Sequence, residues 1–485
     1  LVTAASTNAL SDLDRARVVW LREIFSDGIP GDANRVHELC DVAKQAFDAA
    51  DADLALNLLL GAALRCWWAH TGAEAQARVV DTLLELRDFE QDPRFVATLA
   101  VAEPLRQGAR AIELLSSVVL EQVTDADALR LYGMAAHAVG DEVRSADFLD
   151  RAETRVRDQG RLGLLPHVLG MEGAVLLDLG DWTRSTALSA EGHRVASETG
   201  QPIWSTGTLV NDARACALLG QAERAHDLAT QAENAPSLRA LNDFLACAQL
   251  AHGFACATVG DHLGAFTALS RVFDPGEACH HEREQFGGLG IFVESALHVD
   301  RADEARRIVS KMEEVATITP SPLLDVQLRY ARAVLADDEQ AEALFLEAMG
   351  ADLARWPWPK ARIELAYGSW LRRQRRSAEA RSPLRSAQTT FALIGASWWL
   401  ELARAELRAT GERISVQGPA AQDLLSSQEL QIATLAAEGL SNREIGQRLY
   451  LSPRTVGSHL YRIFPKLDVT SRSQLASRLD GHRPS

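Results

Sequence analysis

Lysine is scarce in this chain, and its scarcity excludes one large class of enzymes. The 485 residues contain four lysines (Lys44, Lys311, Lys360 and Lys466), and none of them follows a glycine. The phosphate loop of nucleotide hydrolases requires the pattern GxxxxGK[ST], so these residues cannot form one. The patterns HExxH, GxSxG and GxGxxG after an expected strand are missing as well. We therefore predict that this chain is not an enzyme and uses no cofactor.

Cysteine pairs and long apolar runs are also missing. The six cysteines are scattered without a CxxC pair, which is typical of reduced thiols and not of a disulfide framework. No apolar run reaches the roughly 18 residues that span a bilayer, and no basic segment followed by an apolar one opens the chain as a secretory signal. These absences predict a cytoplasmic protein without a membrane partner.

Charge is divided unevenly along the chain. Residues 424–485 carry eight basic and five acidic side chains, a net charge of +3. Because the whole chain has a net charge of −16, residues 1–423 have a net charge of −19. An acidic surface repels phosphate and a basic one attracts it. Any nucleic acid should therefore bind at the C-terminal end.

A repeat of 40 residues begins near residue 131, after a series of amphipathic segments at helical spacing. Its turn residues are Gly140, Gly180, Gly220, Gly260 and Asp300. Small residues recur seven positions before and five positions after most of these turns, as in Gly133 and Ser145. Two helices need such residues to approach closely within a hairpin. Two further hairpins are expected around Ala343 and Ala380.

The repeat predicts an all-α fold built from stacked antiparallel helix pairs. The positions of its small residues are similar to those of the tetratricopeptide repeat, although that repeat is normally about 34 residues long, and HEAT-type repeats of about 40 residues are the alternative. Such a stack has a concave surface. We expect a protein or small-molecule effector to bind there.

Four segments within residues 1–410 carry candidate binding residues. The irregular stretch 273–290 and the aromatic stretch 356–359 are candidate loops on the binding surface. Residues 279–282, Cys-His-His-Glu, are of metal-ligating types, but four consecutive residues rarely converge on one ion, so we predict a solvated loop and no metal site. Trp67 and Trp68 could stack on a ligand; because they face about 100° apart on a helix, we predict that both pack against protein.

Residues 411–423 are predicted to form a linker, because Gly411, Gly418 and Pro419 break the helical periodicity. After it, capping boxes mark three helix starts, Ser426 with Glu429, Ser441 with Glu444 and Ser471 with Gln474. Ser452 followed by Pro453 marks a fourth. The predicted helices span 427–437, 442–449, 453–467 and 472–479.

Apolar residues on these helices define a small core, formed by Ile432, Leu435, Ala436, Ile445, Leu449, Val456, Leu460, Ile463 and Leu467. With one stripe of the third helix buried, its other side is free. A helix that packs on its scaffold by one stripe and offers the other to the major groove has the geometry of a recognition helix. The segment is therefore predicted to be a helix-turn-helix.

The stretch EGLSNREIGQRLYLSPRTVGSHLYRIFPKLDVTSRSQL resembles the C-terminal DNA-binding domain of LuxR-type regulators. Together with the repeat, the chain is similar to the C-terminal part of the large ATP-binding regulators of that family. The resemblance implies a tetratricopeptide-like repeat over 1–410, the linker, and a four-helix LuxR-type domain over 424–485. Large members of that family carry an ATP-binding domain in their N-terminal part, and the present residues leave open whether one precedes Leu1.

The resemblance assigns roles to residues of the C-terminal domain. Gly457, Ser458 and Tyr461 would face the bases; Arg443, Arg454, Arg462 and Lys466 would contact phosphates; and Ser471, Leu475, Arg478 and Leu479 would form the dimerisation helix. Gly457 stands where the family usually has a long polar residue, and Pro465 should end or kink the recognition helix. We expect much of the affinity to come from phosphate contacts.

Two functions remain open from the sequence. The first is a bacterial transcriptional regulator, bound as a homodimer to promoter DNA in the nucleoid, with RNA polymerase as a further candidate partner. The second is a helical-repeat adaptor for protein assembly, whose terminal domain gives only weak DNA tethering. The intact capping and core pattern of the terminal domain favours the first.

Overall fold

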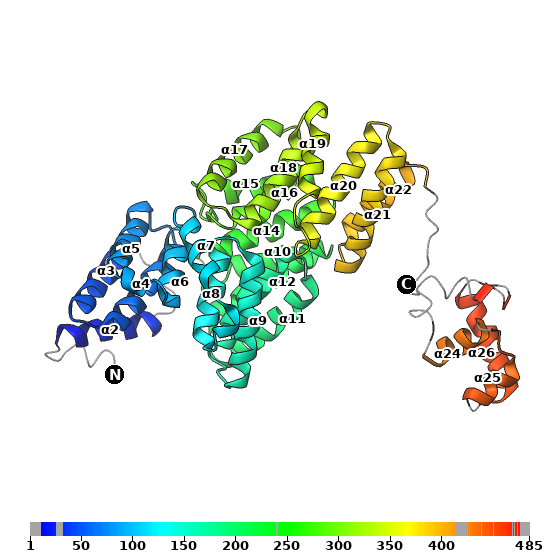
Figure 1. The fold of residues 1–485 in the computed structure, drawn as a ribbon, viewed down its shortest axis with the longest axis horizontal. Coiled ribbons are helices and arrows are strands. Elements are labelled where there is room, and N and C mark those ends of the chain that lie inside the picture. The colour runs from blue at the N-terminus through cyan, green and yellow to red at the C-terminus, as the bar shows by residue number, and fades with distance from the viewer. Residues whose placement is uncertain are drawn as a thin grey trace. The chain divides into compact units, whose positions relative to one another are not determined.

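The computed structural model describes residues 11–25, 33–238 and 241–412 and, in the C-terminal part, residues 425, 427–437, 439–449, 451–467, 469, 471, 472, 474 and 475. The secondary structure of these residues is helical throughout (Figure 1). Their contacts divide the chain into two compact units, Leu1–Glu412 and Arg413–Ser485. None of the described helices is both long enough and apolar enough to cross a membrane.

The first unit is a succession of antiparallel helix pairs. Its N-terminal part contains α2 (Asp12–Phe25), α3 (Ala33–Asp48), α4 (Ala52–Trp68), α5 (Ala73–Glu85), α6 (Pro93–Ala102) and α7 (Gly108–Ser117), with the 3-10 turns η1 (Arg87–Phe89) and η2 (Leu120–Gln122). The repeat forms α8 (Ala126–Ala138), α9 (Glu142–Asp158), α10 (Leu165–Leu179), α11 (Trp182–Glu198), α12 (Pro202–Leu218), α13 (Ala222–Glu233), α14 (Asn242–Thr258), α15 (His262–Phe273), α16 (Gln285–His298) and α17 (Ala302–Ile318). The unit ends with α18 (Pro322–Leu335), α19 (Asp338–Met349), α20 (Pro357–Arg373), α21 (Ser377–Ile394) and α22 (Ser397–Ala409).

The same turn joins the two helices of each repeat. Gly180 has φ 92°, a left-handed conformation that glycine adopts without steric cost. The next N–H, that of Asp181, closes the helix end by donating to the Leu176 carbonyl at 2.9 Å, and the Asp181 side chain then caps α11. All five predicted turn residues have positive φ, including Asp300 at 57°. The predicted tetratricopeptide-like repeat is therefore present.

Small residues bring the helices of a hairpin together, as predicted. A Cβ on Gly133 would lie 2.7 Å from the Leu149 side chain, and the hydroxyl of Ser145 donates to the Gly133 carbonyl at 2.8 Å. The hairpin of α20 and α21 is built the same way around the buried Ala380. The hairpin of α18 and α19 also exists, but Ala343 is exposed and Ala341 takes the buried position.

The repeat coils until its later helices pack on its earlier turns. The N–H of Leu323 in α18 donates to the carbonyl of Gly140 at 2.9 Å. Trp358 of α20 lies against Gly180 and stacks edge-on with Trp182 and Trp399, at 5.1 and 4.5 Å between ring centroids. Trp358 is 5% exposed. The stretch 356–359 is therefore core, and the prediction that it is a loop on the binding surface was wrong.

The irregular stretch 273–290 is solvated only in its first part, where Asp274, Pro275, Gly276 and Ala278 are exposed. Helix α16 begins at Gln285, and the residues just before it pack inward, with Arg283 fully buried. The Nε2–H of His281 donates to the Trp67 carbonyl at 3.1 Å, which ties this loop to α4. His280 instead contacts the Val272 carbonyl at 2.9 Å. The consecutive Cys-His-His-Glu side chains thus point to different partners.

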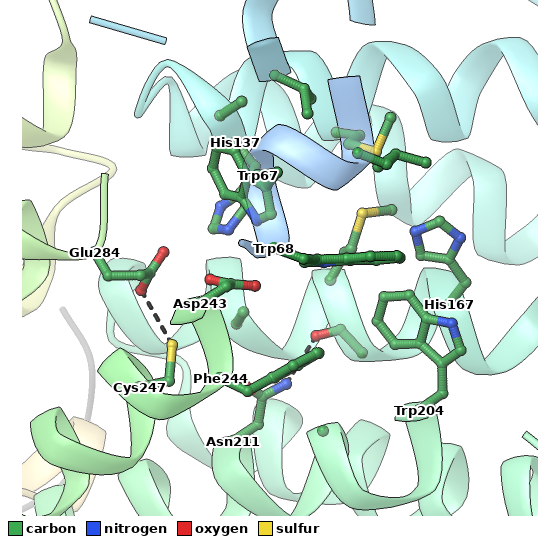
Figure 2. Close-up of a pocket in the computed structure, with 18 residues that line it drawn as sticks. Trp67, Trp68, His137, His167, Trp204, Asn211, Asp243, Phe244, Cys247 and Glu284 are labelled. Atoms are coloured by element: carbon green, nitrogen blue, oxygen red, sulfur yellow. Dashed lines mark hydrogen bonds between the residues drawn. The ribbon is translucent and has the colours of Figure 1, made fainter. Parts of the chain in front are cut away.

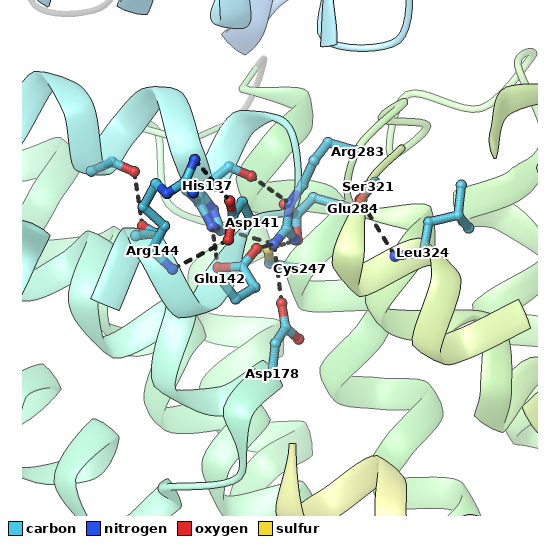
Figure 3. A network of polar contacts seen from close by, with 12 residues as sticks. His137, Asp141, Glu142, Arg144, Asp178, Cys247, Arg283, Glu284, Ser321 and Leu324 are labelled. Atoms are coloured by element: carbon cyan, nitrogen blue, oxygen red, sulfur yellow. Dashed lines mark hydrogen bonds and ion pairs between the residues drawn. The ribbon is translucent and has the colours of Figure 1, made fainter. Parts of the chain in front are cut away.

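Arg283 lies at the centre of a buried ion-pair network (Figure 3). Its guanidinium is 3.1 Å from Asp178 and 3.0 Å from Glu284, and it also pairs with Glu142. Its Nε donates to the carbonyl of His137 at 3.2 Å. Because a buried guanidinium needs its charge and its N–H groups satisfied, this network fixes where the loop meets α8, α9 and α10.

Candidate nucleic-acid interface

The second unit contains three described helices, α24 (Ser427–Ala437), α25 (Asn442–Leu449) and α26 (Pro453–Lys466). Their bounds agree with the predicted ones to within one residue. Ser441 and Glu444 form a reciprocal capping box: the Ser441 N–H donates to the Glu444 carboxylate at 2.7 Å, and the Glu444 N–H donates to the Ser441 hydroxyl at 3.4 Å. These hydrogen bonds from Ser441 hold the pKa of Glu444 below its usual value.

The start of α26 is also as predicted. The Ser452 hydroxyl accepts a hydrogen bond from the Thr455 N–H at 3.0 Å, with Pro453 in the first turn. At the other end, the helix continues through Pro465 and stops one residue later. Of the other two capping boxes, the Ser471 N–H donates to Gln474 at 3.3 Å, whereas Ser426 lies outside the described residues.

The turn between α25 and α26 depends on a glycine that sequence reasoning did not single out. Leu451 donates its N–H to the Gly446 carbonyl at 2.9 Å, which folds the chain back toward α26. A Cβ on Gly446 would lie 2.5 Å from the Leu451 carbonyl oxygen. Backbone cannot move away as a side-chain tip can, so this close approach requires glycine.

The predicted core is present and holds α26 by one stripe. Val456, Leu460 and Ile463 are buried, and they pack with Ile432, Ala436, Ile445 and Leu467. Leu435 and Leu449 are partly buried against this cluster. The core also contains Leu425, Ala433, Val469 and Leu475, which the helical periodicity did not identify.

The opposite side of α26 is open. Tyr461 is 82% exposed, and Arg454, Ser458 and Arg462 are exposed beside it. The Ser458 hydroxyl donates to the Arg454 carbonyl at 3.1 Å, and Arg462 donates through Nε to the Ser458 carbonyl at 3.3 Å. Gly457 is half-buried beside Asn442. Arg443 is exposed at the start of α25.

Lys466 stands apart from the other predicted phosphate ligands. Its ammonium group lies 2.7 and 2.9 Å from the two carboxylate oxygens of Glu429 on α24. This ion pair joins the C-terminal end of α26 to the first turn of α24. A phosphate would have to compete with Glu429, so Lys466 is poorly placed for the role the resemblance gave it.

The predicted dimerisation residues are only partly described. Leu475 is fully buried in the core of its own domain, so its side chain is not available to a partner in this structure. Ser471 is half-buried, and Arg478 and Leu479 lie outside the described residues.

Arg472, for which sequence reasoning predicted no role, holds the turn after α24 by several hydrogen bonds. Its guanidinium donates to the Ala436 carbonyl at 3.3 Å and to the Asn442 side chain at 2.8 Å, and it also binds the Leu440 carbonyl. Two of these acceptors are carbonyls at and just after the C-terminal end of α24, which lack partners within the helix. Arg472 therefore fixes the turn that leads into α25.

An exposed helix held by one buried stripe, preceded by a second helix and a tight turn, defines a helix-turn-helix protein. Residues 423–479 match the family described as "Bacterial regulatory proteins, luxR family". This segment is thus a LuxR-type helix-turn-helix DNA-binding domain, joined in this chain to a tetratricopeptide-like repeat.

Several known regulators are similar to this chain over a short segment. The transcriptional regulatory protein LiaR of Bacillus subtilis is 46% identical over 52 residues, 11% of this chain and 25% of LiaR. The response regulator GacA of Pseudomonas aeruginosa is 46% identical over 54 residues, again 25% of that protein. A Mycobacterium tuberculosis protein named as an HTH-type transcriptional regulator is 47% identical over 51 residues, 10% of this chain. The chain matches only 6% of the length of that protein.

Solved structures resemble the chain only distantly. One similar structure is the crystal structure of a Rap protein complexed with Competence and Sporulation Factor. The alignment covers 73% of this chain and 99% of the Rap chain, at 13% identity and a TM-score of 0.44. A tetratricopeptide repeat protein of Parabacteroides merdae covers 59% of this chain and 99% of its own, at 17% identity and a TM-score of 0.32. The assignment of the repeat therefore rests on its own turns and hairpins.

Proposed function

We propose that this chain is a transcriptional regulator that binds double-stranded promoter DNA through residues 424–485 and is controlled by an effector or partner of its helical-repeat unit. The observation that carries the proposal is the open side of α26, where Arg454, Tyr461 and Arg462 are exposed opposite a buried stripe. A helix presented in this way fits the major groove.

Phosphate contacts supply most of the affinity in this proposal. Gly457 offers no side chain to a base, and the Ser458 hydroxyl is already hydrogen-bonded to its own helix. Tyr461 is left as the base-facing residue with the greatest reach. Arg443, Arg454 and Arg462 lie exposed on the two helices, where they can bind phosphates on both sides of the groove.

The regulator binds as a homodimer, at half-sites about one helical turn apart. Because Leu475 is buried in the core, we assign the dimer contact to the other residues of the predicted dimerisation helix, Ser471, Arg478 and Leu479. RNA polymerase is a further partner that a promoter-bound regulator could contact. The protein acts in the cytoplasm, on the nucleoid.

The test is a mobility-shift assay with the full chain and sheared genomic DNA from its own source, at 50 and 200 mM salt. Replacing Arg443, Arg454 and Arg462 together with alanine should weaken retention strongly and lower the salt slope by about three, since each phosphate contact contributes about 0.9. The control replaces three exposed arginines of the repeat unit, Arg307, Arg373 and Arg408. It removes the same charge and should leave binding unchanged.

A second candidate function is a protein-assembly adaptor, which the net charge of −19 on residues 1–423 favours. An acidic repeat of this size opposes DNA binding and suits a basic protein partner. If the wild-type chain retains no fragment at 50 mM salt, the adaptor is the better explanation. Equal loss of binding in the test and control variants would show that the assigned phosphate contacts are wrong.

A further inference from the structure

The inner face of the repeat contains a cavity with about 70 Å³ of free volume, partly open to solvent. Helices α4, α8, α10, α12 and α14 line it, and Glu284 closes one end just before α16. The contact of α4 with α14, reinforced by the hydrogen bond between His281 and the Trp67 carbonyl, narrows the concave surface at this cavity. Its free volume is below that of sites for drug-sized molecules, so only a small ligand fits.

Aromatic rings form two sides and one end of the cavity. Figure 2 shows Trp68 and Phe244 on opposite sides, with His167 and Trp204 at one end. The His167 ring stacks on Trp204 at 4.3 Å between centroids, and Trp204 meets Phe244 edge-on at 6.2 Å. Burial, followed by the nearby Arg130, lowers the pKa of His167 well below its usual value. This end therefore presents uncharged ring faces.

The other end is acidic. Asp243 and Glu284 face the cavity there, beside Cys247 (Figure 2). Glu284 is held by Arg283 at 3.0 Å, and Arg214 lies 4.0 Å from its second oxygen. Asp243 has no arginine or lysine ion pair among the described residues, and its hydrogen bond comes from Trp67.

The charges around this end do not balance. Four carboxylates (Glu142, Asp178, Asp243 and Glu284) surround two guanidinium groups (Arg214 and Arg283). Burial and the neighbouring Glu284 raise the pKa of Asp243 and outweigh the opposing effects of His281, His137 and the hydrogen bond from Trp67. A cation placed between Trp68 and Asp243 would supply a counter-ion.

A metal ion fits this end less well than an organic cation. Asp243, Cys247 and Glu284 do offer ligand atoms within 4.8 Å of one another. However, Arg214 lies 3.8 Å from the Cys247 sulfur, and burial raises the pKa of that thiol well above its usual value. A thiol that stays protonated beside a guanidinium is a poor metal ligand.

We propose that this cavity binds a small organic amine, protonated at neutral pH, whose ammonium group pairs with Asp243 and whose apolar body lies between Trp68 and Phe244. Ring faces bind ammonium groups through cation–π attraction as well as apolar groups, so both ends of the cavity favour the same ligand class. The proposal deepens the proposed function, since it rests on the repeat unit being the site of the effector.

The probes are phenethylamine, its neutral analogue 2-phenylethanol and its acidic analogue phenylacetic acid, each titrated into the full chain by calorimetry. These ligands share a ring and differ in charge. The amine should bind at least about tenfold more tightly than the alcohol, and the acid should not bind. Asp243→Asn keeps the acceptor for Trp67 while it removes the charge, so it should abolish the preference for the amine.

The matched control is Glu282→Gln, which removes a charge from the neighbouring cavity lined by His70, His280 and His281. It should leave the preference unchanged, and thermal melts should show that both variants fold. Equal affinity for amine and alcohol up to 10 mM, an unaltered preference in Asp243→Asn, or binding of Zn²⁺ in place of the amine would overturn the proposal. If the amine binds but does not change the affinity for DNA, the proposed binding site is correct and only its role in regulation is refuted.

Discussion

The two units place their arginines in opposite ways. In the repeat unit, Arg214 and Arg283 are 1% and 0% exposed and are enclosed by carboxylates. In the C-terminal domain, Arg443, Arg454 and Arg462 are exposed on two helices. A buried arginine is committed to one arrangement of its partners, whereas an exposed one can exchange water for a phosphate. The same side chain therefore fixes a fold in one unit and offers a binding surface in the other.

The units also differ in how they hold together. Each repeat packs only against its neighbours and against the next coil of the same unit, through glycine turns such as Gly140 and Gly180. The C-terminal domain has one core of its own and a single close turn at Gly446. All ten tryptophans lie within residues 1–412, so tryptophan fluorescence reports on the repeat unit alone.

Removal of the buried guanidinium should have the largest effect. Arg283→Met leaves Glu142, Asp178 and Glu284 without their shared partner and should lower the free energy of unfolding of the repeat unit by about 3–5 kcal/mol. Urea denaturation followed by tryptophan fluorescence measures it. The exposed Arg307→Ala is the control and should change stability by less than about 0.5 kcal/mol. Similar small changes in both variants would remove the contrast between buried and exposed arginines.

Acid should unfold the repeat unit partly through Glu284. Burial alone would raise the pKa of this carboxyl, but Arg283 and Arg214 outweigh burial and lower it to about 2. A depressed pKa contributes stability above the unfolded value near 4.5 and loses it as pH falls toward 2. The stability difference between wild type and Glu284→Gln should thus be about 3 kcal/mol at pH 7 and shrink below pH 4.5. A difference independent of pH would contradict this pairing.

Gly446→Ala should affect the C-terminal domain and leave the repeat unit intact. The added Cβ would lie 2.5 Å from the Leu451 carbonyl, so the turn between α25 and α26 must open, at a cost of about 1–3 kcal/mol. DNA retention should fall while the tryptophan-monitored unfolding curve stays unchanged. A shifted tryptophan curve would show that the two units are coupled in stability.

Local signals were sufficient to predict most of the C-terminal domain. The capping residues Ser441 and Ser452 and the periodicity of Val456, Leu460 and Ile463 all act within a few residues of the helix they specify. The turn glycines of the repeat act locally as well. For this reason, helix bounds, repeat turns and core stripes could be predicted from the sequence.

Long-range contacts could not be predicted in this way. Arg283 contacts His137, which lies 146 residues away in the sequence, and His281 contacts Trp67, which lies 214 residues away. The composition of the loop that carries Arg283 predicts a solvated loop. The carboxylates of Glu142 and Asp178 that surround this arginine come from distant parts of the sequence, so the residues next to it do not predict its burial. Trp67 and Trp68 were predicted to pack against protein, yet both line the cavity, and its acidic end at Asp243 comes from a helix distant in sequence. Arg472 was missed for the same reason.

Gly457→Ala should have the smallest effect and the opposite sign to Gly446→Ala. The nearest atom to a Cβ at this position is the Asn442 side-chain nitrogen, at an ordinary 3.5 Å. Alanine should therefore stabilise α26 by up to about 1 kcal/mol, because glycine loses more backbone entropy in a helix. The measurement is the salt concentration at which DNA retention is lost after brief heating, compared with wild type. If the variant is destabilised, Gly457 is required for close packing, as Gly446 is. If it is stabilised, the fold does not require glycine at this position, and the absence of a side chain there serves the DNA-facing surface.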